Sequence, residues 1–252
     1  VETVEDIRSV NVKMTEVMTM MQTTLNKDKS GYILMGSKKQ VEEARMRMKD
    51  QPMICGDFIM KELKEEKWLG DYLSGGLKES VMVTIQRRES KTRRASYEIV
   101  NIVKDYRAQL IGGFRTGLVL WESCVVPSLL YNCSTWVEMG KEEVKALEDI
   151  QDYFLRLLWG AGPGTPRVAL RADTATRSMS ARIWREKIML VFHISHLEEG
   201  ELARDMLEEQ VRHGWPGLVK EVSQLCDMLK VEEARTTSKN RVEYGKDVKK
   251  AC

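Results

Sequence analysis

The stretch LVLWESCVVPSLLYNCSTW, residues 118–136, is the most apolar passage of a polar chain, and the rest of the fold is expected to form around it. A proline inside a helical pattern ends or bends the helix just before it, and Pro127 divides this stretch. The stretch therefore predicts two short helices or one bent helix, with residues 75–194 packed around it. Its large apolar residues recur at nearly helical spacing and are expected to share one buried face: Trp121, Val125, Leu129, Leu130 and Tyr131.

Length and composition indicate an ordinary globular chain. Its 252 residues allow one large domain or two modest ones, and 42% of them are apolar and 31% charged. A net charge of +2 does not by itself predict a polyanionic partner. Only local clusters of basic residues can indicate one. No run reaches the ~18 to 20 apolar residues that a membrane helix needs, so no membrane partner is expected. Because Val1 is neither a methionine nor the start of a signal region, we expect a piece of a longer product.

The five cysteines are odd in number, widely scattered and without a C-x-x-C pair. This pattern predicts reduced thiols in an intracellular protein, in either the nucleus or the cytoplasm. Only three histidines are present and none has ligand spacing, so a structural zinc is not expected.

The first third of the chain predicts alternating helices and strands. Residues 1–26 have the pattern of one amphipathic helix, followed by a polar turn. Short apolar runs at 32–36 and 52–59 predict strands, and the charged segment 40–50 between them predicts a helix. The apolar stripe of the first helix consists of Ile7, Val10, Met14, Val17, Met21 and Leu25.

The remainder is predicted to be helical. Residues 68–73 predict a strand that turns sharply at the glycines of 74–76, and residues 77–110 predict a long helix. The chain as a whole is therefore expected to be α+β and mostly helical. Residues 232–252 are charged and predict a frayed end. Further helices are predicted at 141–160, capped by Gly160, at 178–197, capped by Ser178, and at 201–213 and 216–231.

The densest basic cluster, RRESKTRR, lies at residues 87–94 within the long helix. Arg87, Lys91 and Arg94 are spaced i, i+4 and i+7, which places them on one face, called here the basic face of the helix. Two interpretations remain open. The face is either an ordinary solvated surface or a strip that contacts a phosphate backbone.

Three stretches together resemble the reverse transcriptases of non-LTR (LINE-like) retrotransposons, from the end of the palm through the thumb. LNKDKS before YILMG, residues 25–36, is similar to a turn and strand of that family. KWLG, residues 67–70, resembles the K-Y-L-G that opens the primer-grip hairpin, with Trp in place of Tyr. VPSLLYNCSTW, residues 126–136, and the L-x-x-x-Q-x-x-x-L-R-x-L-W-G pattern that follows are like the helical region after the palm. The resemblance covers roughly residues 20–195.

The resemblance implies part of a palm over residues 1–76, a helical thumb-like region over 77–200, and C-terminal helices with a charged tail over 201–252. It implies a fragment of an RNA-directed DNA polymerase, whose intact form uses Mg²⁺ held by a pair of adjacent aspartates. The resemblance places that pair before Val1, and this sequence contains no Asp-Asp pair. The chain is therefore expected to hold no metal and to be unable to polymerise nucleotides alone.

The resemblance also implies roles for particular residues. Lys29 matches a lysine that approaches the phosphates of the incoming nucleotide, where a cation stabilises developing charge. Trp68, Leu69 and Gly70 match the primer grip, and the basic face would lie along the template–primer duplex. The implied partners are this duplex and the remainder of the polymerase chain. The alternatives are a surface lysine at a turn for Lys29 and a core aromatic for Trp68.

Two further interpretations concern the whole chain. It is either a non-catalytic helical binding or scaffold module, or a decayed element with no retained function. Salt-dependent binding to a nucleic-acid duplex separates the polymerase interpretation from the scaffold.

Overall fold

The computed structural model describes residues 4–21, 23, 26, 30–50, 52–55, 58–106 and 113–252 of the chain. It contains two compact units, residues 1–83 and 84–252. The elements of the described residues are mostly helices, with three two-stranded sheets, which confirms the expectation of a mostly helical α+β fold. None of the helices in these ranges has the length and apolar character needed to cross a bilayer.

The first unit combines helices with short strands. Strand β1 pairs in parallel with β4, while β2 with β3 and β5 with β6 form antiparallel hairpins. Met48 and Met53 form its small buried core, against which Tyr32, Leu34 and Met60 pack. In chain order the elements are α1 (Val4–Met20), β1 (Gly31–Tyr32), α2 (Lys38–Asp50), β2 (Ile54–Cys55), β3 (Phe58–Ile59), β4 (Lys61–Glu62), β5 (Glu66–Trp68) and β6 (Asp71–Leu73).

Of the apolar stripe predicted for the first helix, the side chains that the structure describes are exposed or half-buried, and Ile7 and Leu25 lie outside the described side chains. Val10, Val17 and Met21 are 52%, 47% and 67% exposed, whereas the polar Asn11 is buried. The Asn11 amide donates to Sδ of Met60 over 3.8 Å, so α1 packs on the unit through a polar residue. Periodicity identified the helix correctly but gave the wrong buried face.

The strands are also shorter than the apolar runs predicted. The run 52–59 forms a hairpin of two short strands instead of one strand, and the run 32–36 contributes only Tyr32 to β1.

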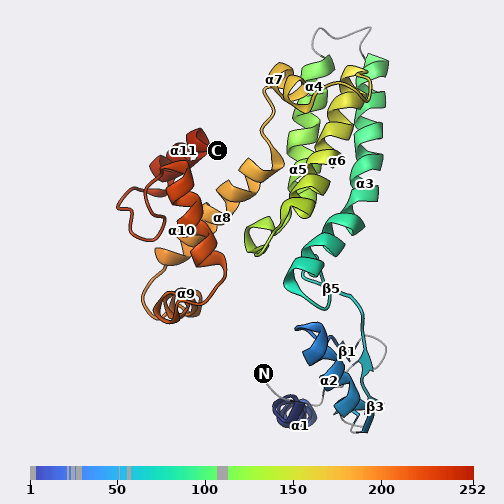
Figure 1. Ribbon diagram of the computed structural model, residues 1–252, viewed down its shortest axis with the longest axis vertical. Coiled ribbons are helices and arrows are strands. Elements are labelled where there is room, and N and C mark those ends of the chain that lie inside the picture. The colour runs from blue at the N-terminus through green and yellow to red at the C-terminus, as the bar shows by residue number, and fades with distance from the viewer. Residues whose placement is uncertain are drawn as a thin grey trace. The chain divides into compact units, whose positions relative to one another are not determined.

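The second unit is a helical assembly, into which α3 continues from the first unit (Figure 1). Helices α3, α4 to α5, and α6 run side by side in Figure 1. A Cβ added at Gly117 of α4 would meet Leu158 of α6 at 2.7 Å and Val103 of α3 at 3.1 Å, so this glycine permits the close approach. The elements are α3 (Leu77–Tyr106), α4 (Gly113–Leu120), η1 (Trp121–Val125), α5 (Val126–Leu129), η2 (Cys133–Thr135), α6 (Lys141–Trp159), α7 (Arg167–Thr174), α8 (Met179–Ser195), α9 (Leu202–His213), α10 (Leu218–Leu229) and α11 (Arg241–Ala251).

Pro127 does not divide its stretch into separate helices. The chain runs from α4 through α5 with one π-helical turn, η1, directly before the proline, where the Val126 N–H donates to the Trp121 carbonyl. Proline has no N–H and its ring crowds the carbonyl four residues earlier, so a wider turn at this point relieves the clash. Of the two alternatives, two short helices are therefore wrong, because the helical conformation continues through the proline.

Trp121 belongs to the buried residues of the second unit. It is fully buried and stacks on Phe154 of α6, with ring centroids 4.2 Å apart and planes 6° apart. Val125, Leu129 and Leu130 are buried as predicted, but Tyr131 is 55% exposed. The chain leaves the helix at Leu130 and reaches a left-handed conformation at Asn132, so Tyr131 no longer follows the helical face.

Helix α7, which the sequence did not predict, is joined to α6 by ion pairs. Arg167 donates to Asp149 at 2.6 Å and also to Asp152, and Arg171 donates to Glu148. Glu148 and Asp152 are buried, so these pairs compensate carboxylates removed from water.

Helix α8 begins where its sequence predicts. The Ser178 hydroxyl accepts from the Ala181 N–H at 3.1 Å, which is an N-cap. Lys187 on the inner face is 4% exposed, and its Nζ donates to Oε2 of Glu221 in α10 at 2.6 Å. The second oxygen of Glu221 accepts from the Glu138 N–H at 2.5 Å.

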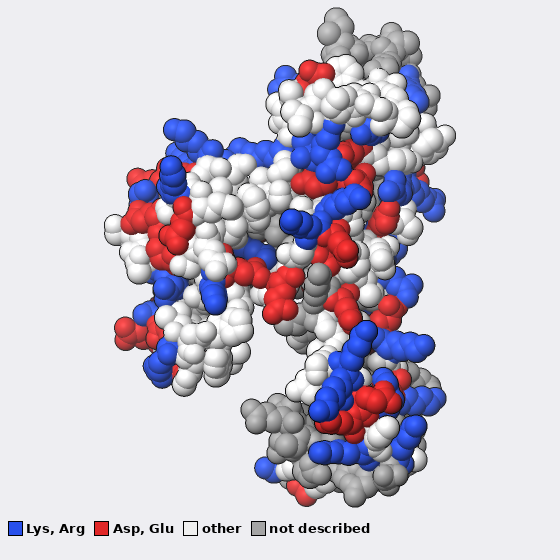
Figure 2. Space-filling view, viewed as in Figure 1, with Lys and Arg blue, Asp and Glu red and all other residues white. Residues whose placement is uncertain are grey.

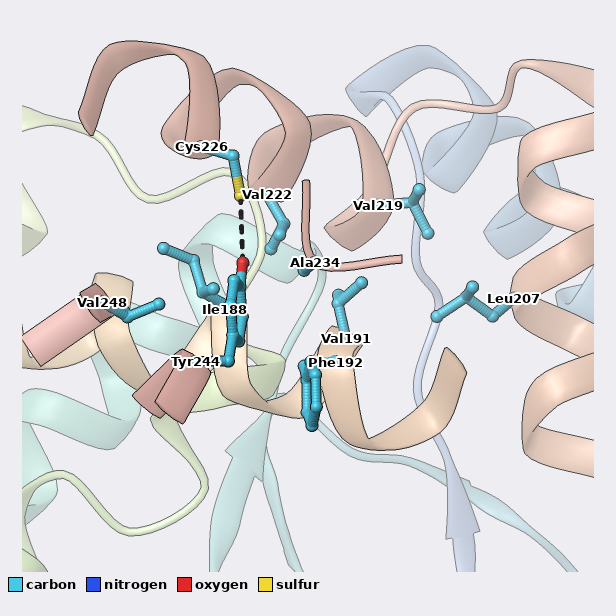
Figure 3. Close-up of a cluster of buried hydrophobic side chains, with 10 residues drawn as sticks. All are labelled: Ile188, Val191, Phe192, Leu207, Val219, Val222, Cys226, Ala234, Tyr244 and Val248. Atoms are coloured by element: carbon cyan, nitrogen blue, oxygen red, sulfur yellow. Dashed lines mark hydrogen bonds between the residues drawn. The ribbon is translucent and has the colours of Figure 1, made fainter. Parts of the chain in front are cut away.

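The predicted frayed end is wrong. Residues 241–251 form α11, and its Tyr244 and Val248 are fully buried in a cluster with Phe192 of α8 and Cys226 of α10 (Figure 3). The Tyr244 hydroxyl donates to the Glu232 carbonyl at 2.8 Å and lies 3.7 Å from the Cys226 sulfur. Two buried side chains one turn apart anchor an otherwise charged helix.

Candidate nucleic-acid interface

The KWLG motif lies on the β5–β6 hairpin. Trp68 pairs with Asp71, so Leu69 and Gly70 form a two-residue turn, with φ of 48° and 94°. Positive φ at both central positions is typical of a type I′ turn, whose twist suits a tight hairpin. The sharp turn is therefore at 69–70 and not at the glycines of 74–76. Those glycines precede α3, where the Ser80 hydroxyl donates to the Gly76 carbonyl at 2.7 Å.

The hairpin tip presents apolar side chains to solvent. Trp68 is 62% exposed and Leu69 is 70% exposed. The alternative of Trp68 as a core aromatic therefore does not hold within the described structure. An exposed indole on a short, turn-stabilised hairpin offers a flat surface on which a base or a sugar can pack.

The RRESKTRR cluster separates into two sets of side chains. Arg87, Lys91 and Arg94 are exposed, and at 100° per residue they fall within about 60° of arc on α3. Arg94 also pairs with Glu98, one turn further along the same face, at 2.9 Å. Figure 2 shows lysines and arginines interspersed with acidic residues, in keeping with the low net charge.

The other two arginines of the cluster have structural contacts. Arg88 donates to the carbonyls of Leu129 and Tyr131 at 3.0 and 2.9 Å, and its guanidinium lies 5.6 Å from the Trp136 ring centroid. These bonds satisfy carbonyls at the end of α5. Arg93 lies 4.5 Å from the Tyr153 ring centroid and pairs with Glu89, so it joins α3 to α6.

A groove of about 330 Å³ adjoins the basic face, between α3 and the η1–α5 segment. Lys91 and Glu98 line it from α3, and Cys124 and Ser128 line it from the other side. Sequence reasoning missed this groove because its two walls are some thirty residues apart and share no motif.

Lys29 lies outside the described residues, as does most of the turn around it. Within the described ranges, no group of three or more His, Cys, Asp or Glu side chains is arranged to hold a metal ion. The four cysteines whose side chains the structure describes, at positions 124, 133, 226 and 252, are free thiols.

Comparison of the chain with protein-family models, curated proteins and solved structures gives no match.

Proposed function

We propose that this chain is part of an RNA-directed DNA polymerase of the non-LTR retrotransposon type, in which it binds the template–primer duplex and positions the primer. The observation that carries the proposal is the hairpin. The residues that resemble the primer grip lie at an exposed tip, with Trp68 at the end of β5 and Leu69 in the turn. An exposed indole can stack on a nucleobase, and an RNA–DNA end supplies such flat surfaces.

The basic face of α3 supports the same function. Its three side chains are exposed, so a phosphate backbone can reach them without any rearrangement of the helix. Each cation that neutralises a phosphate releases counterions, which makes binding steeply dependent on salt. The face contributes affinity without sequence preference, as a polymerase requires.

Catalysis is assigned to the rest of the polymerase. The described residues offer no carboxylate cluster that fits Mg²⁺, and the sequence has no adjacent aspartates. We assign the Mg²⁺ ions to the remainder of the polymerase chain. Lys29 is proposed to approach the nucleotide phosphates in that assembly.

The first test measures binding of the chain to a labelled RNA–DNA hybrid with a recessed DNA primer, by fluorescence anisotropy between 50 and 200 mM salt. The variant R87Q/K91Q/R94Q removes the basic face. Three lost phosphate contacts at about 0.9 each reduce the slope of log K against log salt by about 2.7. Over this fourfold range of salt, the native chain should therefore lose about 40-fold more affinity than the variant.

The matched control removes three other exposed lysines, in K141Q/K145Q/K220Q. It changes the net charge equally, so an effect of total charge would lower its slope as well. Equal slopes for the two triple variants, or salt-independent binding of the native chain, would refute the proposal and favour the scaffold interpretation.

The second test concerns the hairpin tip. W68A should lower affinity for the recessed primer end by about 5- to 150-fold, which corresponds to the loss of ~1–3 kcal/mol of stacking per base. The control is W215A, because Trp215 is 55% exposed and comparable in size. Stability should not change with W68A, since the indole is mostly in solvent. Equal affinities for W68A and W215A would remove the primer-positioning role.

A further inference from the structure

A cavity of about 480 Å³ lies in the second unit among α5, η2, α8 and the end of α11. Its volume is in the range of sites that bind small organic molecules. Val126, Pro127 and Leu130 form an apolar wall on one side, and Ala181 of α8 continues it. The hairpin tip and the basic face of the proposed nucleic-acid interface do not line this cavity.

Four basic residues and one acidic residue, Glu186, also line the cavity. Arg177, Arg182 and Arg185 line it from the start of α8, and Lys249 lines it from α11. Figure 2 shows basic side chains gathered beside the C-terminal end of α11. Guanidinium groups suit carboxylates and phosphates because their N–H donors form a planar fork.

Two of these cations already have acidic partners. Arg182 binds both oxygens of Glu122 at 2.6 Å, and Arg185 donates to Glu186. Both guanidinium groups are therefore already engaged within the protein, which leaves the other two cations to bind an anion.

The other two cations are not neutralised within the protein. In the part of the chain that the structure describes, neither Arg177 nor Lys249 has a carboxylate within ion-pairing distance. Arg177 instead donates to the backbone carbonyl of Lys249 at 3.1 Å, which fixes the two residues next to each other. The lining therefore carries an excess of positive charge over an apolar wall.

Cys133 adds to the apolar part of the lining. Burial raises the pKa of its thiol to about 12, so the thiol is neutral at physiological pH and the cavity gains no negative charge from it.

We propose that this cavity binds an amphipathic anion, a small molecule with an apolar body and a single phosphate or carboxylate head. The head lies against Arg177 and Lys249, and the body packs on Val126, Leu130 and Ala181. The site is independent of the proposed polymerase role, so either assignment can fail without the other.

The test is isothermal titration calorimetry of the 252-residue chain with hexyl phosphate. Inorganic phosphate has only the head and hexanol has only the body. Hexyl phosphate should bind at one saturable site, at least tenfold more tightly than either part. Heptanoate, titrated in parallel, distinguishes the head groups, and the tighter of the two anions identifies the head that the site prefers.

Two variants locate the site. R177Q/K249Q should lower the affinity for hexyl phosphate at least tenfold. K145Q/K220Q, which changes the net charge equally, should leave that affinity unchanged. A181L fills the apolar wall and should abolish binding, with circular dichroism showing whether it folds. If it does not fold, the charge variants alone decide.

Three outcomes would overturn the proposal. The first is inorganic phosphate or hexanol binding as tightly as hexyl phosphate. The second is equal weakening by the two charge variants, which would indicate a general effect of charge. The third is the absence of saturable binding by either amphipathic anion.

Discussion

Removing Glu221 from its ion pair with Lys187 should destabilise the protein by a different amount than removing Lys187. The side chain of Lys187 is 5% exposed, whereas that of Glu221 is 28% exposed. Removing the carboxylate leaves an ammonium in the protein interior, and removing the ammonium leaves a carboxylate that water reaches. E221Q should therefore destabilise the protein more than K187M.

The magnitudes follow from the contacts. Glu221 accepts two hydrogen bonds, one at each oxygen, from Lys187 and from the Glu138 N–H. A glutamine has one acceptor oxygen, so E221Q loses one of the bonds as well as the charge. Breaking a buried pair costs ~3–5 kcal/mol, and partial exposure of Glu221 favours the lower end, about 3 kcal/mol. K187M retains the bond from Glu138 and should cost about 1 kcal/mol.

The double variant gives the sharper result. K187M/E221Q has no unpaired buried charge, so it should be more stable than E221Q alone, by about 2 kcal/mol. The assay is urea unfolding at pH 7 followed by tryptophan fluorescence, which reports mainly on the second unit because five of the six tryptophans lie there. E98Q is the control, because its pair with Arg94 is exposed and should contribute at most about 0.5 kcal/mol. A K187M variant as unstable as E221Q would refute the reasoning.

Three of four smaller predictions use the same unfolding assay, and Leu69→Gly, which lies in the first unit, is followed by circular dichroism. Trp121→Ala should cost about 3–5 kcal/mol, because it removes a fully buried indole stacked on Phe154. Ser178→Ala should cost about 1 kcal/mol through loss of the N-cap bond, and no change would mean that the cap is not formed. Leu69→Gly should stabilise the hairpin by up to about 1 kcal/mol, because leucine at φ 48° is strained; destabilisation would contradict the turn geometry. The thiol of Cys133, with a pKa raised to about 12, stays protonated in the folded state between pH 9 and 12 while the unfolded thiol ionises. The free energy of unfolding should therefore fall between pH 9 and 12 by up to about 1.4 kcal/mol per pH unit. In C133A this contribution to the pH dependence of stability should be absent.

Sequence periodicity predicted the helices whose inner faces are continuous. The helix predicted at 141–160 and the Ser178 cap of α8 are both present, and Gly160 ends α6 in the left-handed conformation. Periodicity did not predict a helix that is held in place by only a few buried residues. Helix α11 buries only Tyr244 and Val248 among charged neighbours, which is too little for a clear period.

The candidate interface could be predicted only in part. Spacing alone placed Arg87, Lys91 and Arg94 on one exposed face, and the KWLG motif predicted a hairpin. Whether Trp68 is exposed depends on what covers it, which a local pattern does not contain. The basic cavity could not be predicted from the sequence, because Arg177 and Lys249 are 72 residues apart and lie next to each other only in the folded chain.

The π-helical turn before Pro127 has a consequence for how this chain tolerates changes in length. Leu129 follows Trp121 by eight residues, which in a regular α-helix would place it about 80° away around the helix axis. The π-turn holds one extra residue, so Leu129 takes the angular position that the seventh residue would have in a regular α-helix. That position is only about 20° from Trp121. The turn thus behaves as a one-residue insertion that the helix has absorbed. A chain lacking one residue between 122 and 124, with alanine in place of Pro127, would form a plain α-helix with the same buried face. Helices of this region that differ by one residue in length can therefore bury equivalent side chains, and an alignment that forbids a gap here would pair the wrong positions.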